Sequence, residues 1–233
     1  MYIDILVFAV IAALLIYRLS SVLGTRHGSE RQRRNPFDPS QQPPADAPAQ
    51  DGVTLDAEPM HPNVVTLGDI QNHVDAAADK DGRVETGLRE IAAADGYFEI
   101  NSFMQGARGA FEMIVLAYSR GDLDTLRPLV SPKLFADFAA GVKAREAAGH
   151  SNELTIHRIK IARIVEAHLG GTMAYVTVDF DVEETSVTRD SSGNIVDGNP
   201  DRIFSVEDIW TFTRDVRNSD PNWTLIETRA AEK

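Results

Sequence analysis

Residues 102–121 read SFMQGARGAFEMIVLAYSRG and show the clearest helical pattern in the chain. Apolar side chains recur there every three or four residues, which places them on one helix face. They are Phe103, Ala107, Ala110, Phe111, Ile114 and Tyr118. Ser102 followed by Gln105 predicts a capping box at the start, and Gly121 predicts the end. We therefore expect one long helix whose aromatic face packs against the rest of a domain.

The segments around this helix predict an α+β domain. Two shorter apolar stripes predict earlier helices at residues 67–77 and 84–92. A further short helix is expected at residues 123–129, and Ser131-Pro132 predicts the start of another. Alternating apolar residues predict strands at residues 154–168, 174–182, 206–212 and 223–227, the first two joined at Gly170-Gly171. Helices followed by an antiparallel meander are typical of helices packed on one sheet face.

Residues 1–23 predict a transmembrane helix. The run from Ile5 to Tyr17 is uninterrupted apolar sequence, and a helix of about 20 residues crosses a hydrocarbon layer of about 30 Å. A cleaved secretory signal and a buried core helix are the alternatives. A signal peptide begins with positive charge, whereas here Asp4 comes first and the positive charge follows.

Arginines after this segment predict its orientation. Basic flanks stay on the cytoplasmic side of a span, so we expect the N-terminus outside and the C-terminal domain in the cytoplasm. A mitochondrial presequence is amphipathic, whereas this segment is uniformly apolar, so a bacterial inner membrane is the expected location. The same side chains are candidates for contact with anionic lipid headgroups. They are Arg18, Arg26, Arg31, Arg33 and Arg34.

A linker is predicted at residues 24–66, which leaves residues 67–233 as one domain. Its first part is basic, and residues 35–66 hold seven of the eleven prolines, a composition typical of a disordered spacer. The whole chain has a formal net charge of −12 although its first 34 residues are net positive, so the domain itself is strongly acidic. Such a domain repels phosphate backbones, and nucleic acid is not an expected partner.

Neither a metal nor a cofactor is expected. The chain has no cysteine, which excludes disulfides and thiolate ligands. Its six histidines show no metal-ligand spacing. Residues 197–201 (DGNPD) resemble the start of a calcium loop, but Arg202 stands where that loop needs glycine, so a turn is the expected structure.

Several motifs together resemble a known family. They are residues 103–114 (FMQGARGAFEMI), 121–126 (GDLDTL), 208–214 (DIWTFTR) and 221–225 (PNWTL). The chain is similar through them, over residues 67–230, to the C-terminal domain of the mitochondrial inner-membrane translocase subunit 44 family, which includes a mitochondrial ribosomal protein and bacterial homologues. The resemblance implies a nuclear-transport-factor-2-like fold, in which a long helix lies in a curved antiparallel sheet above an apolar pocket.

The resemblance also implies a function. The mitochondrial member binds the inner membrane and links a chaperone motor to the import channel. Chaperone tethering uses a long charged N-terminal region that is not seen here, where a predicted anchor stands instead. We therefore expect a non-enzymatic adaptor that binds unidentified proteins or lipid at the membrane, linked to protein translocation or membrane-protein assembly. A partner of the ribosome or insertion machinery is an alternative.

The aromatic helix face and the strands opposite it are the candidate binding site. These side chains are first of all core, but a residual cavity between them would take an acyl chain or an apolar peptide segment. The candidate lining residues are Phe103, Phe111, Ile114, Tyr118, Phe180, Trp210 and Phe212.

Asp208 is the one candidate for catalysis. It shares a strand face with Trp210 and Phe212, and with Tyr118 it would make the carboxylate and phenol of an isomerase-type pocket. The alternative is an aspartate bonded to a turn or paired with Arg214 or Arg202. Alternating acids on a neighbouring strand (Asp179, Asp181 and Glu183) are expected on the solvated sheet face.

Overall fold

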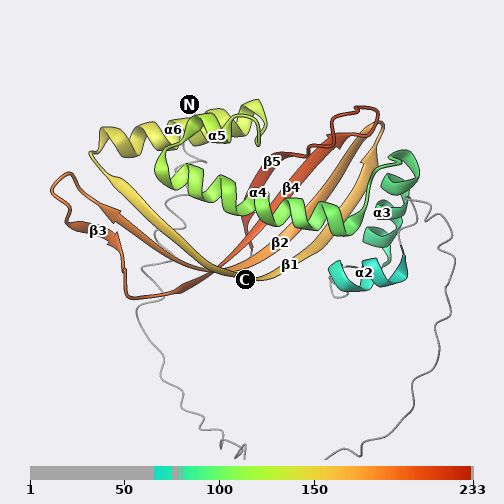
Figure 1. Cartoon of the computed structure of the whole chain (residues 1–233), viewed down its shortest axis with the longest axis horizontal. Coiled ribbons are helices and arrows are strands. Elements are labelled where there is room, and N and C mark those ends of the chain that lie inside the picture. Colours follow the sequence, from blue (N-terminus) through green and yellow to red (C-terminus); the bar gives the residue numbers. More distant parts are fainter. Residues whose placement is uncertain (1–65, 75–78, 80, 232–233) are drawn as a thin grey trace, which may run out of the picture. The chain divides into compact units, whose positions relative to one another are not determined.

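The computed structural model describes residues 66–74, 79 and 81–231, drawn in colour in Figure 1. The predicted anchor at 1–23 and nearly all of the predicted linker at 24–66 lie outside the described residues. Within the described ranges, none of the helices combines the length and the apolar character needed to cross a membrane.

The described domain confirms the predicted order of helices followed by strands. The helices are α2 (Leu67–His73), α3 (Arg83–Ala94), α4 (Ile100–Arg120), α5 (Leu123–Leu126) and α6 (Pro132–Ala147). The strands are β1 (Ser151–Gly170), β2 (Met173–Arg189), β3 (Ile195–Gly198), β4 (Phe204–Asp215) and β5 (Thr224–Ala230). β1 and β2 are longer than expected, and β3 was not predicted.

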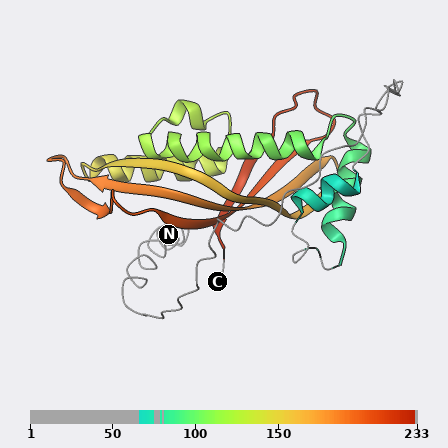
Figure 2. The same cartoon turned by 60° about the horizontal axis from the view of Figure 1, so that its bottom comes forward.

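The strands form one antiparallel sheet in the order β1-β2-β4-β5, with β3 paired to β2. Three register shifts interrupt β1, between Ile156 and Glu166, and such bulges bend a strand. Helices α4, α5 and α6 lie on one face of the curved sheet, and α2 and α3 lie at one end (Figures 1 and 2). The predicted hairpin joins β1 to β2, where Gly171 has a φ of 66°.

The aromatic face of α4 forms the centre of the core, as predicted. Phe111 and Ile114 are almost completely buried in the same core as Val176, Val178 and Phe180 of β2, and the Phe111 ring lies beside that of Phe180. Burying one such side chain stabilises the fold by roughly 1.5–3 kcal/mol. The period-2 pattern of β2 therefore faces the 3.6-residue pattern of α4, which is why the two segments determine the layers of the domain.

The sequence predicted a capping residue at three helix ends, and two of these predictions are correct and one is wrong. Gly121 ends α4 with a φ of 74°, and Ser131 caps α6 by accepting from the Leu134 N–H at 3.3 Å. The capping box expected at Ser102 is wrong. Ile100 is buried in the core and already helical, so packing extends the helix by two residues, and the Ser102 hydroxyl instead donates to Glu99.

β5 is partly covered on the side away from β4. The Leu225 N–H donates to the Leu129 carbonyl at 2.9 Å, and the Ser131 N–H donates to the Leu225 carbonyl at 2.8 Å. Val130, between them, makes an isolated parallel bridge with Leu225. The segment before α6 thus closes the edge of the sheet at the start of β5.

Candidate functional site

The central part of the predicted pocket is filled by its own side chains. The Phe111 ring lies 4.6 Å from the ring of Phe180 and 4.6 Å from that of Trp210, measured between centroids. All three are buried, and so is Ile114. These four residues are core between α4 and the sheet.

An apolar groove lies at the N-terminal end of α4, and two predicted residues, Phe103 and Phe212, line it. It has a volume of about 460 Å³. We call it the α4 groove. Its other lining residues include Tyr97, Phe98, Gly106, Gly109, Met113, Leu129, Arg214 and Trp223.

Aromatic rings make up the floor of the α4 groove. The Trp223 ring lies 4.8 Å from Phe103 and 5.8 Å from Phe98, measured between centroids. At the rim, the side chains of Tyr97 and Met113 are 86% and 50% exposed. Large apolar groups that stay exposed beside a concave apolar surface are typical of binding sites.

Two glycines keep the helix wall of the groove low. A Cβ added at Gly106 or at Gly109 would meet no other atom within 4 Å. Both residues belong to the motif GARGAFE at 106–112, and each costs about 1 kcal/mol of helix propensity relative to alanine. Their positions beside the groove explain what that motif provides locally, namely space above the helix backbone.

A buried ion pair holds the two loops that border the groove. Arg214 Nη1 lies 2.5 Å from Asp95 Oδ2, and the two side chains are 5% and 1% exposed. The same guanidinium donates to the carbonyls of Asp220 and Asn218, and Asp95 also accepts from the Tyr97 N–H. The α3–α4 connection is thereby fixed to the β4–β5 connection.

Asp208 is half-buried and does not form the ion pairs suggested from the sequence. Arg214 binds Asp95 instead, and the Arg202 guanidinium lies over the Phe204 ring at 4.9 Å. The pKa of Asp208 is raised to about 7, mainly because the carboxyl group is buried and secondly because the negative charge of Glu184 is nearby. A carboxyl group in such an environment keeps its proton at pH values well above those at which an ordinary aspartate loses it.

The side chain of Tyr118 faces α6 and does not lie beside Asp208. Its ring contacts Phe138 at 5.1 Å between centroids, and its hydroxyl lies so close to Gly141 that an added Cβ would be 2.5 Å away. Within the described part of the chain no hydrogen bond joins Tyr118 to Asp208. The structure therefore does not assemble the carboxylate and phenol of an isomerase-type site.

The alternating acids of β2 lie on the outer sheet face, and each one pairs with a base on β1. Asp179 pairs with Arg163, Asp181 with Lys160 and Glu183 with Arg158, at nitrogen–oxygen distances of 3.0, 2.7 and 2.9 Å. The hydrogen bond from the Arg158 guanidinium holds the pKa of Glu183 below its usual range. These carboxylates stabilise the sheet surface as cross-strand pairs.

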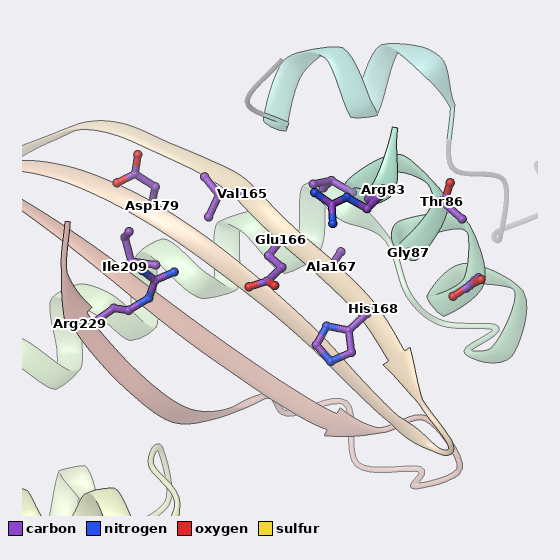
Figure 3. Close-up of a pocket in the computed structure, with 12 residues that line it drawn as sticks. Arg83, Thr86, Gly87, Val165, Glu166, Ala167, His168, Asp179, Ile209 and Arg229 are labelled. Atoms are coloured by element: carbon purple, nitrogen blue, oxygen red, sulfur yellow. The ribbon is translucent and has the colours of Figure 1, made fainter. Parts of the chain in front are cut away.

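A second depression, of about 690 Å³, lies on the outer sheet face beside α3 (Figure 3). Thr86 comes from α3, Glu166 and His168 from β1, and Arg229 from β5. Acidic and basic groups are mixed along its walls, so its charge favours no single class of ligand. It was not predicted from the sequence, because its walls come from five separate elements, α3, β1, β2, β4 and β5.

No group of three or more histidine, aspartate or glutamate side chains in the described ranges is arranged to hold a metal ion. The segment 197–201 that resembles a calcium loop includes the end of β3 and a turn, in which the Asp201 N–H donates to the Asn199 side chain at 2.9 Å. The expected turn is present.

The described domain has an α+β fold, with helices packed on a curved antiparallel sheet and an open apolar groove beside α4. Residues 84–230 match the Tim44-like domain. That match covers more than half of the chain, and the chain belongs to the Tim44-like domain family. The family resemblance seen in the motifs is thereby confirmed.

Two relatives match this chain over different lengths. An uncharacterized protein, RP434, of Rickettsia prowazekii is 22% identical over 224 residues, which cover 96% of this chain and 95% of the relative. The mitochondrial import inner membrane translocase subunit TIM44 of Homo sapiens is 25% identical over 150 residues, which cover 62% of this chain. The matched part is only 32% of the human protein, so this chain corresponds to about a third of its length.

Two solved structures show partial similarity. The intermembrane space region of the chloroplast protein ARC6 aligns with a TM-score of 0.42 and 12% identity, over 56% of this chain and 97% of that chain. A protein of the NTF2-like family from Streptomyces avermitilis aligns with a TM-score of 0.31 and 13% identity, over 58% of this chain and all of the other.

Proposed function

We propose that the protein is a membrane-anchored, non-enzymatic adaptor, in which the Tim44-like domain binds an apolar segment of a partner protein in the α4 groove. The observation that carries the proposal is the groove itself, where exposed Tyr97 and Met113 stand beside an aromatic floor. Translocase subunits among the relatives support a role in protein translocation or membrane-protein assembly. The predicted anchor supports a bacterial inner membrane, with the domain in the cytoplasm.

The groove suits an apolar segment for three physical reasons. Its volume falls within the range of roughly 300–1,000 Å³ that is usual for small-ligand sites. Its floor is aromatic, so an apolar side chain bound there would make a large apolar contact and would not have to displace a charged group. Its walls are held by the Asp95–Arg214 ion pair, and a preformed site loses little conformational entropy on binding. A lipid acyl chain is the other occupant with the same chemistry.

An isomerase-type enzyme is the second candidate function, favoured only by the raised pKa of Asp208. The orientation of Tyr118 toward α6 argues against it. If the adaptor proposal is correct, Asp208→Asn leaves the protein functional in a strain that depends on it, because the charge serves no reaction.

Crosslinking from the rim of the groove tests the adaptor function. A photo-crosslinking amino acid at Tyr97, in the full chain in its own membrane, is expected to trap a protein partner. Gly109→Leu fills the groove and is expected to abolish that crosslink, since its side chain enters open space on a helix that tolerates it. The matched control is Gln105→Leu, which adds the same side chain at an exposed position of α4 outside the groove.

The outcomes are distinguishable. A protein crosslink that survives Gly109→Leu and Gln105→Leu equally would overturn the assignment of the groove. A crosslink to lipid alone would replace the protein partner with an acyl chain. Loss of function in Asp208→Asn, with folding retained, would instead favour an enzyme.

A further inference from the structure

The far half of β5 has a backbone edge that no described residue covers. The Ala231 N–H donates to the Glu207 carbonyl at 3.2 Å, so in an antiparallel ladder the backbone groups of Arg229 and Glu227 also face β4. The N–H and C=O groups of Thr228 and Ala230 then point away from the sheet. Leu225 bonds the segment before α6, and this cover does not continue along the strand.

The side chains on this edge carry two opposite charges without partners. Glu227 and Arg229 are both exposed on the outer face, two residues apart on one strand. Neither makes an ion pair or a side-chain hydrogen bond within the described residues. By contrast, Asp179, Asp181 and Glu183 on the outer face of β2 each pair with a base on β1.

We propose that this edge pairs antiparallel with β5 of a second copy of the chain, about a two-fold axis through Thr228. In that register Thr228 lies opposite the partner's Thr228, and their outward-facing N–H and C=O groups exchange two hydrogen bonds. Glu227 then lies opposite the partner's Arg229, and Arg229 lies opposite the partner's Glu227. Each charge gains the cross-strand partner that it lacks in one copy.

The charges select this register over others. Parallel pairing in register would place Glu227 beside the partner's Glu227, and like charges directly opposite are destabilising. The cover on Leu225 limits the overlap to residues 226–230. A register shift at this point of the β4–β5 ladder separates the covered part of β5 from the open part. The resulting contact is short, so it forms a weak dimer that tethering to one membrane would strengthen.

A cysteine placed on the proposed axis tests the pairing directly. The chain has no natural cysteine, so Thr228→Cys in the full-length protein reports on this position alone. Directly opposed strand residues have Cα atoms about 5.5 Å apart, which falls in the range for disulfides. On mild oxidation we expect a disulfide-linked dimer. The control is Ser192→Cys, an exposed residue in the β2–β3 turn, which we expect to remain monomeric.

Charge reversal supplies the second measurement. At about 0.15 M salt, where long-range repulsion between the acidic domains is screened, Glu227→Arg is expected to reduce Thr228→Cys crosslinking about tenfold, because it places like charges across both ends of the pair. Adding Arg229→Glu restores opposite charges and is expected to restore crosslinking. Circular dichroism of each variant reports folding.

Three results would overturn the proposal. One is Thr228→Cys crosslinking no faster than Ser192→Cys. Another is a folded double variant, Glu227→Arg with Arg229→Glu, that crosslinks no better than Glu227→Arg alone. The third is capture of a different protein at Thr228→Cys in membranes without any homodimer, which would assign the edge to a foreign strand.

Discussion

At the scale of single residues, Arg214 contributes more to the shape of the α4 groove than any residue predicted to line the pocket, because it fixes the two loops beside it. The sequence suggests it, as an alternative to Arg202, as a partner for Asp208. That pairing is wrong for a simple reason. Six residues along a strand span about 20 Å, beyond the reach of an arginine. The true partner, Asp95, lies in a loop 119 residues away, and no local pattern indicates such a contact.

Removal of one member of this ion pair is expected to be costly. Arg214→Met leaves Asp95 buried without its counter-charge, and breaking a buried pair in this way costs about 3–5 kcal/mol. Urea denaturation measures the loss. The control is Arg217→Met, whose side chain is 72% exposed beside Asp215, and its expected cost is below about 1 kcal/mol. Equal effects of the two substitutions would show that the buried pair contributes nothing special.

Asp208 is expected to make the stability of the domain depend on pH. Its pKa is about 7 in the folded state and about 3.9 in an unfolded chain. Between these values the folded protein holds a proton that the unfolded chain releases, so stability falls as pH rises, by up to about 1.4 kcal/mol per pH unit. The stabilisation is complete below about pH 4 and lost above about pH 7.

Asp208→Asn removes this titration and leaves the size of the side chain unchanged. We expect its free energy of unfolding to exceed that of the parent at pH 8, and the difference to disappear near pH 4. Glu184→Gln is the control for the second cause of the shift, because it lowers the pKa of Asp208 and ends the decline at a lower pH. Parallel stability curves for the parent and Asp208→Asn would contradict the burial of the carboxyl group.

At the scale of elements, periodic segments were predictable and juxtaposed loops were not. The stripes of α3 and α4 and the alternation of β2 and β4 reflect burial on one face, which sequence period reports directly. Strand β3 was not predicted, because Ile195 and Val196 are both exposed and the segment shows no alternation of apolar and polar residues. The position of the α4 groove was not predicted, because Tyr97 and Trp223 come from two loops that lie close together only in the folded chain.

Helix α3 offers a matched test of how elements approach one another. A Cβ at Gly87 would lie 2.0 Å from the Ala167 carbonyl oxygen of β1, so the helix packs directly on strand backbone. Gly87→Ala is therefore expected to destabilise the domain by about 2 kcal/mol or more. Gly109→Ala, on the open side of α4, is expected to stabilise it by up to about 1 kcal/mol. Thermal melts of both variants check the opposite signs.

At the scale of the whole molecule, the family and the layered α+β architecture were predictable from the sequence. Motifs at 106–112 and 208–214 indicated the family, and residues 84–230 confirm it. The two motifs together indicate the family because each combines residues required by the core with residues that line the groove. The aromatic positions are core, whereas Gly106, Gly109 and Arg214 shape the groove. The occupant of that groove depends on another molecule, which this sequence does not encode.

The arrangement in the membrane remains a prediction, and a fusion tests it. The apolar run from Ile5 to Tyr17, followed by five arginines, predicts that the C-terminus is in the cytoplasm. A phosphatase that is active only in the periplasm is expected to be silent when fused after Lys233. The same fusion behind an exported signal is the positive control. Activity of the first fusion would reverse the predicted orientation.

The bridge between Val130 and Leu225 has a consequence for the order of events during synthesis. The two residues lie 95 positions apart in the sequence, and ribosomes add about 5–20 residues per second. Val130 is therefore made roughly 5–20 seconds before the strand that covers it. In the finished domain its side chain is 4% exposed. During that interval the bridge to Leu225 cannot form, so the growing chain presents an unfinished apolar edge, open to chaperones, until β5 is made.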